Sequence, residues 1–195
     1  MVVGVCRFAL ILAAWTLACR TEVPEPDSVR HAFVRYMALV ANGDYEGVFG
    51  LLIPEARDRI AKTHANIRRC KDLIERHYPE VLRAQALADL GPPDVRNAPT
   101  PARFFAALIS TGGRPTLSIG DRLRSQIRRI TRSDMGTHIV TTFAGERFEW
   151  MEGGDGRFYY VPDANASERI QNDYLASVQK LQAVQSAVKS FERAR

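Results

Sequence analysis

Cysteine and histidine are the side chains that could act as nucleophiles or metal ligands in this chain, and both are scarce. The 195 residues contain three cysteines, Cys6, Cys19 and Cys70, and four histidines. No pair of cysteines has the Cys-x-x-Cys spacing of a redox or zinc motif. His64 and His77 have no acid placed to complete a ligand set. The sequence therefore predicts no metal site and no cofactor.

Other catalytic motifs are also missing from the sequence. There is no Gly-x-Ser-x-Gly nucleophile elbow, no phosphate-binding Gly-Lys-Ser/Thr loop and no His-Glu-x-x-His. The glycine-rich segment Gly153–Gly156 joins two expected strands rather than opening a helix, so we interpret it as a hairpin loop. Cys70 falls on the apolar stripe of an expected helix, where a free cysteine behaves as a small buried hydrophobic residue.

The N-terminal segment has the pattern of an export signal. A positive charge at Arg7 precedes an apolar run from Phe8 to Ala18, which is 11 residues long. A bilayer span needs roughly 20 residues, so the run predicts a secretory signal rather than a transmembrane helix. Its end, Leu17-Ala18-Cys19, resembles the lipobox of bacterial lipoproteins, in which the cysteine is lipidated and becomes the first residue of the mature chain.

The lipobox resemblance implies a signal peptide at residues 1–18, a lipid on Cys19 and a short tether over residues 19–27. Two or more acyl chains, each contributing about 0.8 kcal/mol per buried CH₂, would hold the protein on a membrane. Arg20 stands where an inner-membrane retention signal places aspartate, which favours the outer membrane over the inner one. An ordinary secretory signal cut near Ala18, with Cys19 incidental, is the alternative, and a cytoplasmic chain is a third.

The basic residues are mostly interspersed with acids. Lysine and arginine number 27 against 22 aspartates and glutamates, a net charge of +5. The dense cluster consists of Arg122, Arg124, Arg128, Arg129 and Arg132. A nucleic-acid groove would need exposed aromatic side chains beside such a cluster, and an exported protein would not meet nucleic acid. We therefore expect no nucleic-acid partner, and interpret the cluster as a solvated strand face or a contact with anionic lipid head groups.

Five helices are expected in the first half of the chain, because apolar residues recur there every three or four positions. Ser28 can cap the first, which ends at Asn42-Gly43, and Asp44 can cap the second. Prolines mark the starts of the later helices: Pro54 of a helix reaching Tyr78, Pro79 of the fourth and Pro101 of the fifth. Residues 91–100 are expected to form an irregular loop.

The pattern then changes to the two-residue alternation of β-strands. Glycine-containing turns separate the expected strands, which predicts an antiparallel meander of four to five strands. The segments lie near Thr116–Ile119, Leu123–Thr131, Thr137–Phe143, Arg147–Met151 and Arg157–Val161. On the third segment, either the face of Ile139 or the face of Val140 could be the core.

The last element is an expected helix of about 25 residues that begins around Asn165–Ser167. Its narrow apolar seam either packs on the chain's own sheet and helices or binds a partner helix, because the seam is narrow enough for a coiled coil. The candidates for partner binding are Ile170, Tyr174, Val178, Leu181 and Val188.

Four segments resemble the NTF2-like superfamily, particularly its lipid-anchored members from bacterial envelopes. They are Ala41–Glu46, Leu51–Arg57, Val140–Glu146 and Gly154–Tyr160. The resemblance implies a single α+β domain over residues 28–195, with N-terminal helices packed on one face of a curved antiparallel sheet around a pocket. The chain departs from the family in its large helical insert and its long C-terminal helix.

An NTF2-like enzyme would place an acid and a base in that pocket, and the candidates are His138, Asp134, Tyr159 and Tyr160. His138 has no visible partner, and Asp134 falls in an expected turn. We therefore predict a non-enzymatic, lipid-anchored envelope protein that binds a small ligand or an envelope protein. The alternatives are a pocket enzyme of hydrolase or isomerase type and a helix-mediated assembly subunit. The sequence leaves the oligomeric state open.

Overall fold

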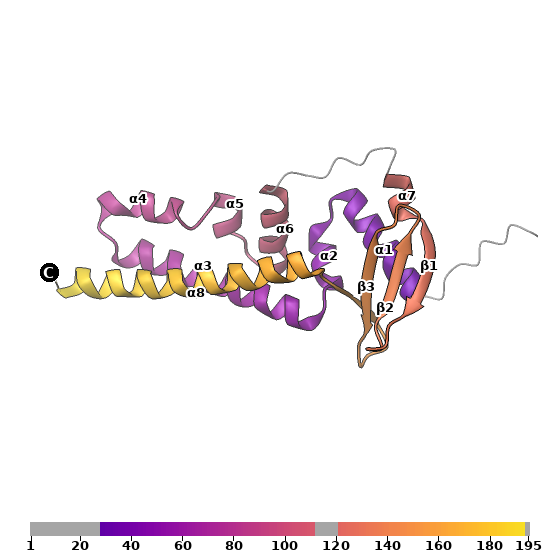
Figure 1. Cartoon of the computed structure of the whole chain (residues 1–195). Helices are drawn as coiled ribbons and strands as arrows, with labels where there is room; N and C mark the ends of the chain where they lie inside the picture. The colour runs from indigo at the N-terminus through magenta and orange to yellow at the C-terminus, as the bar shows by residue number, and fades with distance from the viewer. Residues whose placement is uncertain (1–27, 112–120, 194–195) are drawn as a thin grey trace, which may run out of the picture.

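The computed structural model describes residues 28–111 and 121–193 as a mixed α+β protein, with eight helices and a four-stranded antiparallel sheet in these residues (Figure 1). The expected signal peptide, Cys19 and the tether lie outside the described residues, as does the expected strand at Thr116–Ile119. Within the described ranges, no helix is both long and apolar enough to span a bilayer.

The elements follow one another as helices first, strands next and one long helix last. The helices are α1 (Val29–Asn42), α2 (Tyr45–Leu51), α3 (Pro54–His77), α4 (Glu80–Ala88), α5 (Pro93–Arg96), α6 (Pro101–Thr111), α7 (Asp121–Ser125) and α8 (Ala164–Arg193). The strands are β1 (Ile127–Arg132), β2 (His138–Thr142), β3 (Arg147–Glu152) and β4 (Phe158–Val161).

The first helix boundaries lie where the capping residues predict them. The side-chain oxygens of Ser28 and Asp44 accept backbone N–H bonds at 3.2 and 2.9 Å in the first turns of α1 and α2. Gly43, with φ of 68°, ends α1 in the left-handed conformation that glycine adopts without strain. Pro54 begins α3, where its missing N–H costs no hydrogen bond.

Three expectations about local structure are wrong. The second expected strand begins at Ile127 rather than Leu123, because residues 121–125 form the short helix α7 and Leu123 is exposed. Residues 91–100 are not wholly irregular, since Pro93 starts the single turn α5. Helix α8 is capped by Asp163 and is 30 residues long, so it starts earlier and runs further than predicted.

The sheet is a simple meander in the order β1-β2-β3-β4. Its β3–β4 hairpin contains Gly156 at φ of 76°, which confirms the hairpin interpretation of Gly153–Gly156. On β2, Val140 and Thr142 are fully buried, so the covered face is theirs and that of His138. Helix α1 lies across this face.

Aromatic side chains fill the space between α1 and the sheet. Trp150 of β3 and Phe33 of α1 are fully buried there. The ring centroids of Phe33 and Phe148 are 5.3 Å apart, and those of Tyr36 and Tyr160 are 4.9 Å apart. We call α1 and the four strands the sheet end of the molecule.

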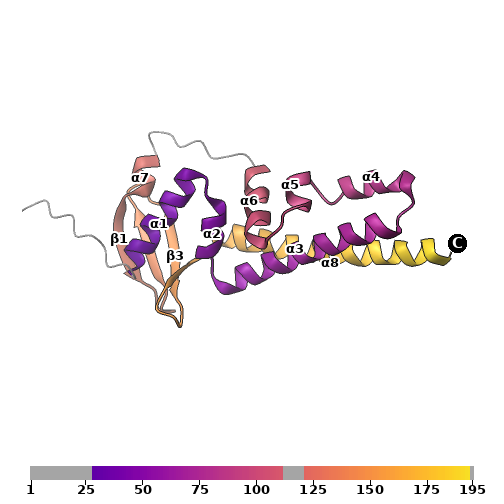
Figure 2. The same ribbon diagram turned by 180° about the vertical axis from the view of Figure 1, so that it is seen from behind.

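The other long helices extend away from the sheet, so the expectation that the N-terminal helices all pack on one sheet face is wrong (Figures 1 and 2). Helices α3 and α8 lie side by side, with α4, α5 and α6 along α3. We call these five helices the arm. The stripe of α3 is covered by α8 rather than by the sheet: Cys70 and Ile74 pack with Val184. The predicted burial of Cys70 is confirmed, at 0% exposure.

Candidate functional site

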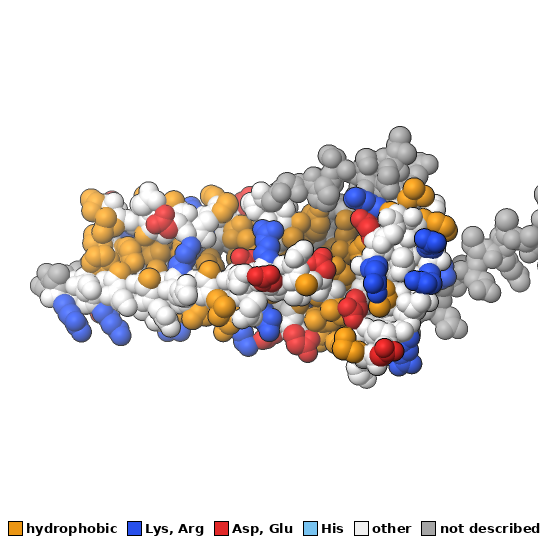
Figure 3. Space-filling model, viewed as in Figure 1, with side chains coloured by type: hydrophobic (Ala, Val, Ile, Leu, Met, Phe, Trp, Pro, Cys, Tyr) orange, Lys and Arg blue, Asp and Glu red, His pale blue; other side chains and the backbone are white. Residues whose placement is uncertain are grey.

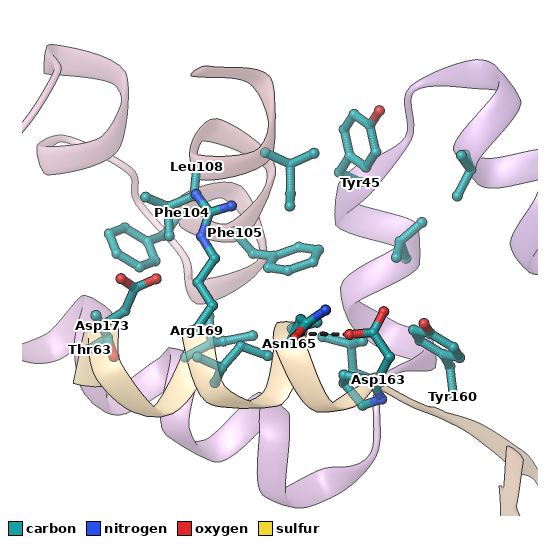
Figure 4. A pocket seen from close by; sticks show the side chains of 18 of the residues that line it. Tyr45, Thr63, Phe104, Phe105, Leu108, Tyr160, Asp163, Asn165, Arg169 and Asp173 are labelled. Carbon is teal, nitrogen blue, oxygen red and sulfur yellow. Dashed lines mark hydrogen bonds between the residues drawn. The ribbon is translucent and has the colours of Figure 1, made fainter. Parts of the chain in front are cut away.

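A cavity of about 520 Å³ lies where the sheet end meets the arm. We call it the junction pocket (Figure 4). Its walls are mostly aromatic and aliphatic side chains contributed by α1, α2, α3, α6, β4 and the first turns of α8. The apolar lining comprises Tyr36, Val40, Tyr45, Val48, Leu52, Ile60, Phe104, Phe105, Leu108, Ile109, Tyr160, Pro162, Ala166 and Ile170.

The pocket forms because the chain between α2 and α3 is fixed to the edge of the sheet. Leu52 forms an isolated parallel bridge with Tyr160, and the backbone N–H of Ile53 donates to the carbonyl oxygen of Tyr160 at 3.0 Å. Pro54 then starts α3 away from the sheet. On the other side, Pro162 follows β4 and α8 begins, so the two long arm helices both start beside the same edge strand.

Polar groups lie on the α8 side of the junction pocket. The Asp163 carboxylate accepts the backbone N–H of Ala166 at 2.8 Å and so caps α8. Figure 4 shows the Arg169 side chain reaching from α8 toward Phe104 and Leu108 of α6. Among the residues that the structure describes, Arg169 has no hydrogen bond and no ion pair, so its guanidinium can bind a ligand group.

Two tyrosines meet at the sheet side of the pocket. The rings of Tyr36 and Tyr160 pack against each other with centroids 4.9 Å apart, and both side chains line the pocket. Burial is the largest cause that raises the pKa of both tyrosines above the ordinary tyrosine value, and the nearby carboxylate of Asp163 raises each pKa further. Both side chains are therefore neutral hydrogen-bonding groups at physiological pH.

The four residues proposed for acid–base chemistry are not brought together. Tyr160 lines the junction pocket, whereas Tyr159 points to another cavity and donates its hydroxyl hydrogen to Asp155 at 2.7 Å. His138 packs its ring against Phe158, with centroids 5.1 Å apart, and has no hydrogen-bond partner in the described part of the chain. Asp134 is exposed in the turn between β1 and β2.

Two of the partner-binding candidates on α8 pack against the other helices of the arm. Ile170 packs against the cluster around Ile60 and Phe104, and Leu181 packs against the cluster around Cys70 and Ile74. Val188 is buried, while Tyr174 and Val178 are half-buried. Binding of a partner through these five residues stays a prediction.

The histidines discussed from the sequence have structural contacts. His64 is buried, and its Nε2 lies 2.8 Å from the carbonyl oxygen of Ala98. His77 Nδ1 lies 3.3 Å from Glu192 Oε1. In residues 28–111 and 121–193, no group of three or more histidine, cysteine or acidic side chains is arranged to hold a metal ion.

The arginine cluster of the sequence lies partly on an edge strand. Arg128, Arg129 and Arg132 are exposed on β1, where charged side chains discourage pairing with another chain. Arg124, in α7, forms an ion pair with Glu146 at 3.3 Å.

Sequence reasoning missed most of the junction pocket. Phe104-Phe105 carried a usable signal, because adjacent aromatic residues on one helix cannot both face the same core, and Phe105 is one of the pocket walls. Arg169 carried no such signal. No protein-family model, curated protein or solved structure matches the chain.

Proposed function

We propose that this protein is a non-enzymatic, lipid-anchored protein of the bacterial cell envelope that binds a mainly apolar small molecule in the junction pocket. The observation that carries the proposal is the pocket itself. Its volume of about 520 Å³ falls within the range of small-molecule sites, and its apolar walls with a few polar groups have the usual composition of such sites.

The polar groups of the pocket suggest the kind of ligand. Neutral hydroxyls of Tyr36 and Tyr160 lie at one side, and the unpaired Arg169 guanidinium lies on α8. A molecule with an apolar body and one neutral polar end would place the body against Phe105 and Leu108, and the end near Arg169 and the two carboxylates that line the same side. A fully polar ligand would leave the apolar walls in contact with water.

An NTF2-like classification is part of this proposal. Helix α1 across a four-stranded antiparallel meander, and a pocket beside the sheet, support it. The extended arm remains a departure from that family. A binding role is favoured over catalysis because His138 and Asp134 lie outside the junction pocket, and burial raises the pKa of Tyr36 and Tyr160, which disfavours their ionisation.

A neutral apolar dye such as Nile red tests the pocket. We expect the wild-type chain to increase the dye's fluorescence with saturation, and Ala166→Trp, which fills the pocket from α8, to weaken binding about tenfold or more. Ala183→Trp is the matched control, because it places the same side chain at an exposed position of the same helix. Equal dye affinity of the two variants would contradict the proposal.

The lipid anchor is tested by metabolic labelling with a palmitate analogue. Wild type and Cys70→Ala should both be labelled, because Cys70 is buried in the arm. Cys19→Ala should lose the label. If Cys19→Ala is labelled as strongly as wild type, the anchor proposal is wrong, while the dye experiment still tests the pocket.

A further inference from the structure

A second cavity, of about 240 Å³, lies on the other side of the Tyr159–Tyr160 pair. We call it the basic pocket. Arginines from three elements or loops line it: Arg35 of α1, Arg57 of α3 and Arg157 before β4. We propose that the basic pocket binds a phosphate group. This site is separate from the junction pocket, whose lining contains none of these arginines.

The charge balance of the basic pocket favours an anion. No aspartate or glutamate is among the described residues that line it. The acid that touches its side chains is Asp155, whose carboxylate accepts the Tyr159 hydroxyl at 2.7 Å and lies 4.0 Å from Arg157 Nε. The Tyr159 hydrogen bond, the largest cause, lowers the pKa of Asp155. The lining thus carries three guanidinium groups, and the neighbouring Asp155 carboxylate forms an ion pair with Arg157.

Arg57 is the central observation. Its guanidinium lies over the Tyr159 ring, 5.2 Å from the centroid, which holds the planar group in place. Its Nε is shielded from solvent and has no hydrogen-bond partner within the described residues. A desolvated charged donor without an acceptor is unfavourable. A phosphate bound in the pocket would supply acceptor oxygens to this guanidinium in the planar geometry that arginine offers.

The wall around the arginines leaves room for a phosphate at Gly50 of α2, where a Cβ would meet no atom within 4 Å. Gly47 also lines the pocket but is closely packed, and its N–H donates to the Asp44 carboxylate at 2.9 Å. Ser28 and His31, in the first turn of α1, also line it. The amino end of α1 carries a partial positive charge, which adds to the field of the arginines.

A phosphate could come from solution or from a phospholipid head group. Ser28 follows Cys19 by nine residues, a length of chain that spans at most about 30 Å. The head-group source therefore rests on the proposed anchor, which would keep the basic pocket near a bilayer. The solution source does not depend on the anchor.

Titration calorimetry with inorganic phosphate tests the site on the full chain carrying Cys19→Ser. We expect Arg57→Gln and Arg35→Gln to weaken phosphate binding about tenfold or more. Arg132→Gln on β1 is the control, because it removes the same charge from an exposed edge strand. Arg35 is exposed, so Arg35→Gln tests the site even if Arg57→Gln fails to fold.

Flotation with phosphatidylcholine vesicles, with and without phosphatidylglycerol, identifies the source. Binding to the anionic vesicles that is lost in Arg57→Gln and kept in Arg132→Gln assigns the site to a lipid head group. Phosphate binding that depends on Arg57, without such vesicle binding, assigns it to free phosphate. Equal phosphate and vesicle binding by the pocket and control variants, or no binding of either probe by wild type, would overturn the proposal. Nile red binding is measured on the same variants, so failure of this site is distinguishable from failure of the junction pocket.

Discussion

The sheet end and the arm bury different kinds of side chain. The core between α1 and the sheet is largely aromatic, with Phe33 and Trp150 fully buried. The outer arm is held by smaller side chains, Cys70, Ile74 and Val184, where α3 meets α8. Helix α4 has no buried residue, and Figure 3 shows apolar side chains gathered over that part of the arm. The difference is between a largely aromatic core at the sheet end and an aliphatic core in the outer arm, where α3 and α8 make the main contact.

The comparison also explains where the junction pocket lies. The aromatic core ends at Tyr36 and Tyr160, and the arm core begins at Ile60 and Phe104. These four residues line opposite sides of the pocket. The cavity therefore lies where the two cores meet, and Tyr160 packs against both of them.

The largest expected effect is at Trp150. Trp150→Ala should lower the free energy of unfolding by about 3–5 kcal/mol, because it leaves a cavity in the aromatic core. Urea denaturation measures the loss. Trp150→Phe is the graded control: its loss should be smaller, because the indole Nε1 is buried without a partner in the described residues and phenylalanine has no such donor. Equal losses would show that ring size does not decide the stability of the sheet end.

The arm should respond less strongly to the corresponding change. Ile74→Ala should lower the free energy of unfolding by about 2–4 kcal/mol, and Ile74→Val by about 1 kcal/mol. The reason is that the Ile74 side chain of α3 is nearly fully buried against α8. Amide hydrogen exchange should show the loss of protection in α3 and α8 with little change in the sheet. Uniform loss across both regions would contradict their separate packing.

The joint between the two regions is tested at Asp163. Asp163→Ala should cost about 1 kcal/mol, because it removes the cap at the start of α8. Asp163→Asn keeps an oxygen that can accept the Ala166 N–H, and thermal unfolding should leave it close to wild type. An equal loss in both variants would assign the effect to the charge rather than to the cap.

The smallest effect is expected on α4. Val81→Ser should change the free energy of unfolding by no more than about 0.5 kcal/mol, because Val81 is 87% exposed and packs on no core. Chemical denaturation measures the change. Val95→Ser is the contrasting variant, because Val95 is a buried residue of α5. A large loss at Val81 would mean that α4 is covered in solution.

Local signals in the sequence predicted much of the fold. Ser28, Asp44 and Pro54 each act through the few residues beside them, so their caps and starts could be predicted without the tertiary structure. The structure around Leu123 could not be predicted in this way. Its alternation with arginines fits either a strand or a single helical turn until its exposure is known. The covered face of β2 depended on α1, which precedes β2 by about a hundred residues.

The sites were less predictable than the fold. The walls of the junction pocket come from segments that are contiguous only because α2 and α3 are joined at the edge of β4. The basic pocket draws Arg35, Arg57 and Arg157 from distant positions, whereas the sequence directed attention to the dense cluster that includes Arg128 and Arg129. Spacing along the chain finds clusters that are local, and both pockets are assembled from residues that are not.

The uninterrupted course of α8 has a mechanical consequence. Its 30 residues form a lever about 45 Å long, with its base beside Asp163 and the junction pocket. Because α8 packs along α3, the two helices would tilt together, and a tilt of about 5° at that base would move the far tip by about 4 Å. A ligand that slightly widens the junction pocket would thus displace the far tip of α8. Distance measurements between two spin labels can detect a displacement of this size.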